Sequence, residues 1–279
     1  MDNLVFGCVA PTARACMVRI LEDVAQEVGV SISMYTASSY EELARAVQHR
    51  LVDLAWLPPI AYVALDRQKI VKPLVASERG GGLSFQSVII VHRSSRFLFL
   101  KELAGLRAAW VDPFSASGYV FPRVELASAG VDVTSFCDET FYESHEEVVR
   151  AVALHHADFG GTFATLGPRG EIVRSAWQDL PEAPESEREL MGRPRPTKSS
   201  IRILATLGSL PADLVAARSD VPAALQTRLT RAFVAVSRDP RNRLLLLEAF
   251  GADELKPIKP RGYDILRAET ERAAAAGLL

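Results

Sequence analysis

Apolar positions over the first quarter of the chain follow two alternating patterns. Short apolar or alternating runs have the length of strands, and between them lie apolar stripes at helical spacing, the first of which ends at Gly29. The predicted strands are residues 4–10, 30–35, 53–57 and 71–76, and the predicted helices are residues 16–28, 40–52 and 60–67. Alternation of strand and helix predicts an α/β domain with a mostly parallel sheet covered on both faces.

A second series of the same layout follows a glycine-rich turn at residues 78–83. Its predicted strands are residues 85–91, 108–111, 133–136, 157–161 and 201–206, and its predicted helices begin at Ser115 and at His145. Residues 178–199, rich in proline and charge, predict an exposed connection. A helix that starts at Pro222 and two further helices, over residues 241–250 and 263–275, close the chain. The repeated layout predicts two α/β lobes.

The totals exclude several classes of protein. The chain has 279 residues, of which 48% are hydrophobic, enough for one large or two medium domains. Its net charge of −2 and its scattered Lys and Arg show no footprint of nucleic-acid or anionic-membrane binding. Three widely spaced cysteines indicate neither a disulfide framework nor a metal cluster. The first residues lack the pattern of a signal peptide, so we expect a cytoplasmic protein unless a leader was removed.

The most informative stretch runs from Trp110 to Tyr119. An apolar strand stops at Asp112-Pro113, and Ser115 and Ser117 precede a segment that continues as a helix. A strand, a small hydroxylated turn and a helix start point backbone N–H groups and hydroxyls at an anion. The alternative is that Ser115 only caps the helix.

Five blocks in this order give the chain a resemblance to the substrate-binding proteins of phosphate, phosphite and phosphonate ABC transporters. They are residues 52–56, 84–91, 112–119, 144–146 and 157–158, with a looser sixth at 210–215. The resemblance implies a two-lobed, periplasmic-binding-protein-like (venus flytrap) fold with mixed, mostly parallel sheets. Its two crossovers are expected near residues 91–94 and 204–210, which gives one lobe from residues 1–91 plus 207–279 and another from 92–206.

The resemblance also assigns ligand-binding residues. It implies that Ser115, Ser117 and the N–H groups through Gly118 and Tyr119 hold an oxyanion, with Ala116 where the family has Thr, and that His145 contacts the same anion. Asp213 matches an acid that meets a ligand amine, the alternatives being a surface His145 and a solvated Asp213. Because loops after strand ends meet at the cleft of such folds, Trp56 and Pro11 are expected in its wall, although a core position for Trp56 is an equal alternative.

The chain departs from the family's aminophosphonate binders. Leu57 and Phe85 stand where these often carry Tyr, and residues 160–165 offer no carboxylate for an ammonium group. A small or less polar oxyanion is therefore expected as ligand, captured in an interlobe cleft.

The resemblance implies a transport role. We expect an ABC transporter permease as partner, a monomer, and no cofactor, metal or nucleic acid, with a periplasmic or membrane-associated place if a leader was removed. A cytoplasmic sensor or an enzyme on the same fold remains the alternative, although the sequence contains no nucleophile elbow, Walker loop or dinucleotide fingerprint.

Overall fold

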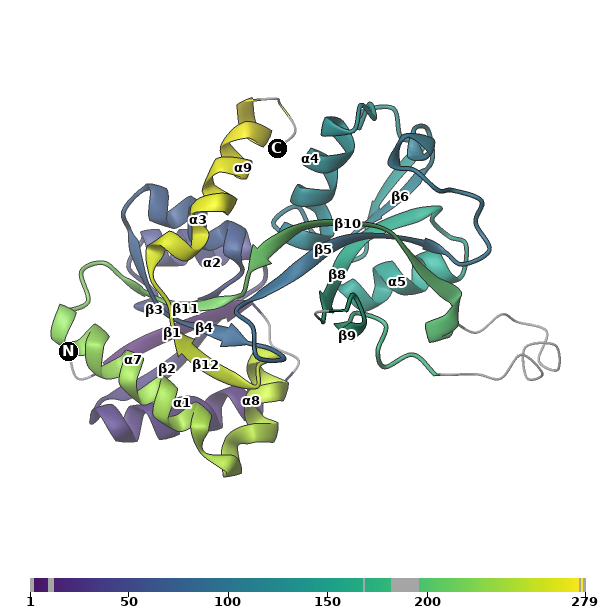
Figure 1. The fold of residues 1–279 in the computed structure, drawn as a ribbon. Helices are drawn as coiled ribbons and strands as arrows, with labels where there is room; N and C mark the ends of the chain where they lie inside the picture. Colours follow the sequence, from purple (N-terminus) through teal and green to yellow (C-terminus); the bar gives the residue numbers. More distant parts are fainter. Residues whose placement is uncertain (1–2, 10–12, 168, 182–195, 276, 278–279) are drawn as a thin grey trace. The chain divides into compact units, whose positions relative to one another are not determined.

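The computed structural model describes residues 3–9, 13–167, 169–181, 196–275 and 277 (Figure 1). The chain divides into two compact units, of which the first comprises Met1–Ser84 and Pro211–Ala268 and the second Phe85–Leu210 with the residues from Glu269 on. The first boundary lies before the expected crossover at residues 91–94, and the second falls at the end of the expected return at residues 204–210. The first boundary lies earlier because the strand expected to end the first lobe pairs with the second unit's sheet from its first residues. No described helix has both the length and the apolar character that a membrane span requires.

The first unit is a six-stranded sheet in the order β12-β4-β11-β3-β1-β2. Its strands are β1 (Asn3–Val9), β2 (Ser31–Ala37), β3 (Leu54–Leu57), β4 (Val71–Glu78), β11 (Leu214–Arg218) and β12 (Glu254–Pro257). Its helices are α1 (Arg14–Val28), α2 (Tyr40–Gln48), α3 (Pro59–Arg67), α7 (Ala223–Arg238), α8 (Arg243–Phe250) and the start of α9 (Asp264–Ala275), with 3₁₀ turns η4 (Pro240–Asn242) and η5 (Pro260–Tyr263).

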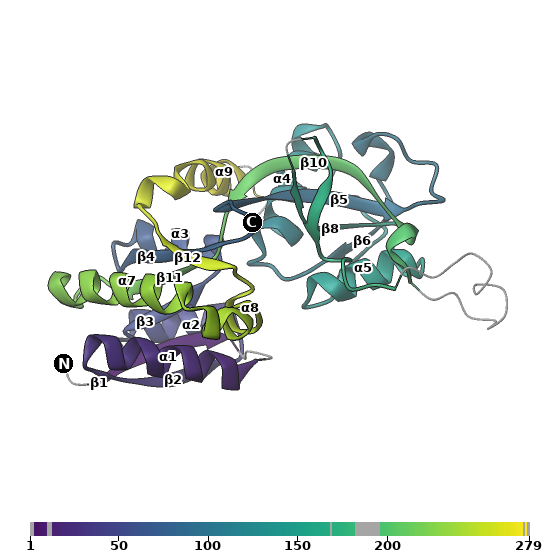
Figure 2. The ribbon, with the colours of Figure 1, turned by 60° about the horizontal axis from the view of Figure 1, so that its bottom comes forward.

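Helix α1 shows how the sequence pattern builds this unit. The predicted stripe Met17, Ile20, Leu21 and Val24 is buried in one core with side chains of α7 and α8, which lie beside α1 in both views (Figures 1 and 2). Gly29 ends the helix at φ 69°, a left-handed conformation that glycine adopts without a steric penalty. The prediction of this helix is confirmed.

Strand direction in the first sheet departs from the mostly parallel expectation. The β1–β2 and β1–β3 pairs are parallel, but the other three of the five pairs are antiparallel. Two of these pairs are formed by β11, which returns from the second unit and runs between β3 and β4 in the opposite direction, and the third is formed by β12 with β4.

The second unit contains a sheet in the order β10-β5-β8-β6-β7, with β9 paired to β8. Its strands are β5 (Ser84–His92), β6 (Arg107–Trp110), β7 (Asp138–Phe141), β8 (Phe159–Leu166), β9 (Ile172–Ser175) and β10 (Ile201–Pro211). Its helices are α4 (Phe121–Ser128) and α5 (His145–Ala153), a π-helical turn η2 (Ala116–Val120), and 3₁₀ turns η1 (Leu100–Leu103) and η3 (Lys198–Ser200).

Two predicted segments of this unit need comment. The strand expected at residues 133–136 lies instead at Asp138–Phe141, where exposed side chains on an edge strand leave no apolar pattern to detect. Most of the exposed connection expected at residues 178–199, including Pro184 and Pro194, lies outside the described residues.

Candidate functional site

The turn after β6 is shaped by Asp112. Its carboxylate accepts a hydrogen bond from the backbone N–H of Phe114 at 2.7 Å, and its carbonyl oxygen accepts one from Ser115 at 2.9 Å. Ser115 then keeps an extended backbone, with φ −73° and ψ 114°, and becomes the N-cap of the π turn. The predicted sequence of strand, hydroxylated turn and helix is confirmed, with a π turn at the helix start.

The hydrogen bonds of this turn decide which groups can meet a ligand. The Ser115 hydroxyl accepts from the N–H of Gly118 at 3.0 Å, and its carbonyl oxygen accepts from Tyr119 at 3.1 Å. The turn itself uses the N–H groups of Gly118 and Tyr119, so their contact with an anion stays a prediction and would require competition with Ser115. In the described part of the chain, no protein acceptor is found for the amides of Ala116 and Ser117 or for the Ser117 hydroxyl, although the Ser117 residue is only 3% exposed.

Close packing of backbone positions this turn against the sheet. A Cβ atom on Gly118 would lie 2.4 Å from Cγ2 of Val111, and one on Gly161 of β8 would lie 3.0 Å from the Gly118 carbonyl oxygen. The Ser117 carbonyl oxygen also accepts from the Ser87 hydroxyl of β5 at 3.0 Å. Gly118 and Gly161 are therefore required for the turn to approach the strands.

His145 is the first residue of α5, after the N-cap Ser144. Its Nδ1 lies 3.0 Å from the hydroxyl of Thr162, which is fully buried in β8. If the hydroxyl donates to Nδ1, the imidazole proton is on Nε2, and that nitrogen is a donor suited to an anion. Thr162 was not among the predicted residues, because a hydroxyl inside a strand carries no sequence signal of its partner.

Parallel strands bring the Ser115 turn and His145 to the same edge of the sheet. β6 is parallel to both β7 and β8, so their carboxyl ends lie together, and the two helix starts follow β6 and β7 directly. Loops after strand carboxyl ends are the usual ligand-binding positions of α/β sheets. We call this group (Ser115, Ala116, Ser117, His145 and Thr162) the Ser115 site.

Two aromatic rings pack one after the other beside the imidazole of His145. The Phe163 ring meets the imidazole edge-on at 4.9 Å between ring centroids, and the Phe85 ring meets Phe163 at 6.0 Å. Phe85 is 7% exposed, and neither ring has a polar group. The side of His145 that faces these rings is therefore apolar.

The Tyr119 ring points into a cluster that does not include the Ser115 site residues. It packs against Trp110 and Phe141 at centroid distances of 5.7 and 5.0 Å, and the guanidinium group of Arg123 lies 5.3 Å from its centroid. Arg123 forms an ion pair with Glu139, which also accepts from the Trp110 indole. This buried cation therefore has a carboxylate partner, and the helix start has no acidic or basic residue in its own first turn.

The predicted residues of the first unit are built into that unit's packing. Trp56, at the end of β3, is half-buried and meets the Phe250 ring edge-on at 4.9 Å between centroids. Leu57 is fully buried and pairs with Leu214 of β11. Contact of either side chain with a ligand stays a prediction, and Pro11 lies outside the described residues.

Asp213 has a cationic partner that the sequence did not reveal. Its carboxylate accepts from Nη2 of Arg79 at 2.8 Å, and Nε of the same guanidinium donates to the Gly251 carbonyl at 2.7 Å. The Asp213 carboxylate is therefore not a solvated loop group. A role toward a ligand amine stays a prediction, and it would require competition with Arg79.

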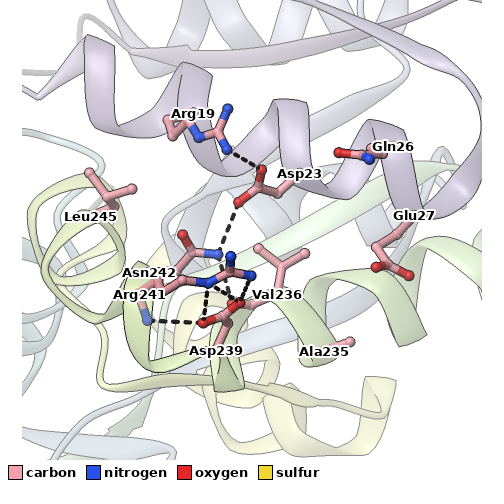
Figure 3. A pocket seen from close by; sticks show the side chains of 10 residues that line it. All are labelled: Arg19, Asp23, Gln26, Glu27, Ala235, Val236, Asp239, Arg241, Asn242 and Leu245. Atoms are coloured by element: carbon pink, nitrogen blue, oxygen red, sulfur yellow. Dashed lines mark hydrogen bonds and ion pairs between the residues drawn. The ribbon is translucent and has the colours of Figure 1, made fainter.

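A cavity of about 510 Å³ lies in the first unit between α1, α7, η4 and α8 (Figure 3). Its charged side chains pair with one another, Arg19 with Asp23 and Arg241 with Asp239. With Glu27, three carboxylates line it against two guanidinium groups. This balance disfavours an anion, so the cavity is not an alternative to the Ser115 site.

Comparison of sequences finds a family that matches most of the chain and a similar protein whose role is described. The sequence model of a family described as "ABC transporter, phosphonate, periplasmic substrate-binding protein" matches residues 12–263. The chain is similar to the phosphate-import protein PhnD of Mycolicibacterium smegmatis, with 28% identity over 162 residues, or 54% of this chain and 49% of that protein. It thus spans about half the length of this curated relative.

Comparison of structures finds the same fold at low sequence identity. XAC2383 from Xanthomonas citri, bound to ATP, has a TM-score of 0.78 at 21% identity, with 99% of each chain covered. PhnD1 from Prochlorococcus marinus, in complex with methylphosphonate, has a TM-score of 0.74 at 16% identity and covers 100% of this chain and 99% of its own. The predicted mixed α/β class is confirmed.

Proposed function

Because the chain belongs to the family of periplasmic substrate-binding proteins of phosphonate ABC transporters, we propose that it captures a small phosphonate, phosphite or phosphate-like anion at the Ser115 site. The observation that carries the proposal is the start of the helix at Ser115. Two backbone amides and a hydroxyl there have no protein partner in the described chain, and the first turn contains no acid. A helix start of this kind favours an anion by about 0.3 to 2 kcal/mol, and each hydrogen bond to a charged oxygen adds about 1.5 to 3 kcal/mol.

The surroundings of the site favour a ligand without an ammonium group. The apolar ring of Phe163 adjoins His145 and that of Phe85 adjoins Phe163, and the carboxylate of Asp213 already has Arg79 as partner. A methyl substituent fits such surroundings better than an aminoethyl one. The methylphosphonate in the complex of the Prochlorococcus relative is therefore the first ligand to test.

The wider role follows from the family. Its members deliver ligands to transporters and are described as periplasmic, so we propose that this chain acts outside the inner membrane as a monomer, hands its ligand to an ABC permease and catalyses no reaction. Enclosure of the ligand between two lobes belongs to the same proposal.

Titration calorimetry tests the ligand class. We expect methylphosphonate, phosphite or phosphate to bind, and 2-aminoethylphosphonate to bind at least about tenfold more weakly than methylphosphonate, because the Phe163 ring beside His145 is apolar and the Asp213 carboxylate is already paired with Arg79. ATP belongs in the panel, since the Xanthomonas relative is described as bound to it. Binding of none of these anions, or tightest binding of the aminophosphonate, would contradict the proposal.

A further inference from the structure

The loop that follows β5 in the second unit (Figure 1) carries two adjacent large apolar side chains that are exposed to solvent. Leu98 is 67% exposed and Phe99 is 69% exposed. The flanking Phe97 and Leu100 turn inward and pack against the core around Trp110 and Phe159. Of these four apolar residues, Phe97 and Leu100 are thus partly buried, and Leu98 and Phe99 between them face the solvent.

Specific hydrogen bonds hold this presentation in place. The Glu102 carboxylate accepts from the backbone N–H groups of Leu98 and Phe99 at 2.7 and 2.8 Å, and these bonds hold the pKa of Glu102 below its usual range. On the other side, the Arg202 guanidinium of β10 donates to the Phe97 carbonyl at 2.6 Å. These bonds satisfy the N–H groups of Leu98 and Phe99 and the carbonyl of Phe97. They hold the loop in the conformation that exposes the Leu98 and Phe99 side chains.

Cationic residues flank the exposed pair in the sequence. Arg93, Arg96 and Lys101 are all exposed, and no ion pair with any of them is found within the described chain. Glu102 is the acid of this segment, and its carboxylate is occupied by the loop's own N–H groups. A local excess of positive charge therefore accompanies two apolar side chains, although the net charge of −2 and the scattered Lys and Arg of the whole chain indicate no binding to anionic membranes.

We propose that residues 93–101 form a docking loop for an anionic lipid surface. In this arrangement Leu98 and Phe99 enter the boundary between headgroups and acyl chains, and Arg93, Arg96 and Lys101 remain at the level of the lipid phosphates. Long cationic side chains with apolar stems, next to Phe and Leu, are the composition that favours the membrane interface. One short loop gives weak and reversible attachment, which is independent of the Ser115 site.

A lipid surface fits this loop better than a protein surface does. A stable protein interface buries about 800 Å² on each partner and places its apolar residues in a broad central patch. Here two side chains project from a single loop, and the three cations that flank them in the sequence form no ion pair among the described residues. Attraction to anionic lipid requires only the charge, at about 1 kcal/mol for each Lys or Arg at the surface, or about a fivefold change in binding.

Co-sedimentation of the full chain with vesicles tests the proposal. We expect binding to vesicles of equal parts phosphatidylglycerol and phosphatidylcholine, about fivefold weaker binding for Arg96→Gln, and at least about thirtyfold weaker binding for Leu98→Ser/Phe99→Ser. Binding should also weaken in 0.5 M salt and with phosphatidylcholine alone. The matched control is Ile265→Ser, since Ile265 is 68% exposed but follows the acidic Asp264, and this variant should bind as the wild type does.

A second measurement reports on insertion itself. In the Phe99→Trp variant, brominated lipids should quench the fluorescence of the added Trp. The fluorescence of the Trp added by Ile265→Trp should not be quenched. Unchanged thermal unfolding and methylphosphonate titration would show that both variants are folded. Absence of wild-type binding to anionic vesicles, or equal binding of the Leu98→Ser/Phe99→Ser variant, would overturn the proposal. Binding only to vesicles that contain a membrane protein would also overturn it and would assign the loop to a protein partner.

Discussion

Among the described residues, three helix starts are capped by serine, and they differ in whether an acid follows the cap. Ser39 and Ser144 accept hydrogen bonds from Glu42 and Glu147, and in each case two glutamates occupy the first turn of the helix. Ser115 accepts from Gly118 in the same way, but no acid follows it. Because a helix start carries partial positive charge, the first two helices supply their own anions, whereas the third supplies none and is the start at which we propose that a ligand binds.

The two edges of the second sheet show the same contrast. At the amino ends of the parallel strands, Arg107 of β6 forms a bidentate pair with Asp158, which precedes β8. At the carboxyl ends lie the Ser115 turn and His145, where the first turn of the π helix contains no charge. One edge is closed by its own ion pair; at the other, the π turn presents neutral donors, and the glutamates of that edge, Glu146 and Glu147, belong to the first turn of α5.

The largest effect is expected when the Ser115 start loses its hydroxyls. Ser115→Ala/Ser117→Ala should weaken methylphosphonate binding by about two to four orders of magnitude, since two hydrogen bonds to a charged oxygen are lost. Calorimetry measures this change. Ser39→Ala is the matched control, because it removes the same kind of cap from α2 and costs the same stability of about 1 kcal/mol without affecting binding. Equal binding by the double variant would show that Ser115 only caps its helix, as Ser39 and Ser144 do.

A smaller effect is expected from the glycine that allows the π turn to approach the sheet. Gly118→Ala should lower the free energy of unfolding by about 1 to 3 kcal/mol, because the new methyl group would overlap Val111. Urea unfolding measures the change. Gly82→Ala is the control, since the nearest atom to its added Cβ is 3.7 Å away and no large change is expected. A neutral Gly118→Ala would show that the turn relaxes more easily than its packing indicates.

The smallest effect concerns the closed edge of the second sheet. Hydrogen bonds from Arg107 hold the pKa of Asp158 below its usual range, although partial burial opposes them. The ionised carboxylate therefore stabilises the fold above the unfolded pKa of about 3.9, and this contribution is lost as the pH falls below that value through the lower folded pKa.

Asp158→Asn should accordingly lower stability at pH 7 by about 0.5 to 1 kcal/mol. The difference from the wild type should shrink as the pH falls from 5 to 3, and methylphosphonate binding at pH 7 should not change. Thermal unfolding at several pH values measures the first effect, and a difference that grows toward low pH would refute the assigned sign.

Local patterns in the sequence determined the elements with strong periodicity or distinct boundaries. The buried stripe of α1, its end at Gly29, and the hydroxylated turn after β6 all follow from neighbouring residues, because the spacing of apolar side chains and the capping groups act over one or two helical turns. The same reasoning found Ser115, Ser117 and His145, with the family resemblance giving these residues a role.

Tertiary structure alone decided the features that depend on distant partners. The Arg79 partner of Asp213 lies 134 positions away in sequence, and the Thr162 partner of His145 lies 17 away. The edge strand β7 has no apolar pattern, so only its pairing with β6 reveals it. Hydrogen bonds within the turn decided which N–H groups remain for an anion, and Glu102 and Arg202 decided that Leu98 and Phe99 face outward. Composition and periodicity carry no record of such pairings, because they are made only when the chain is folded.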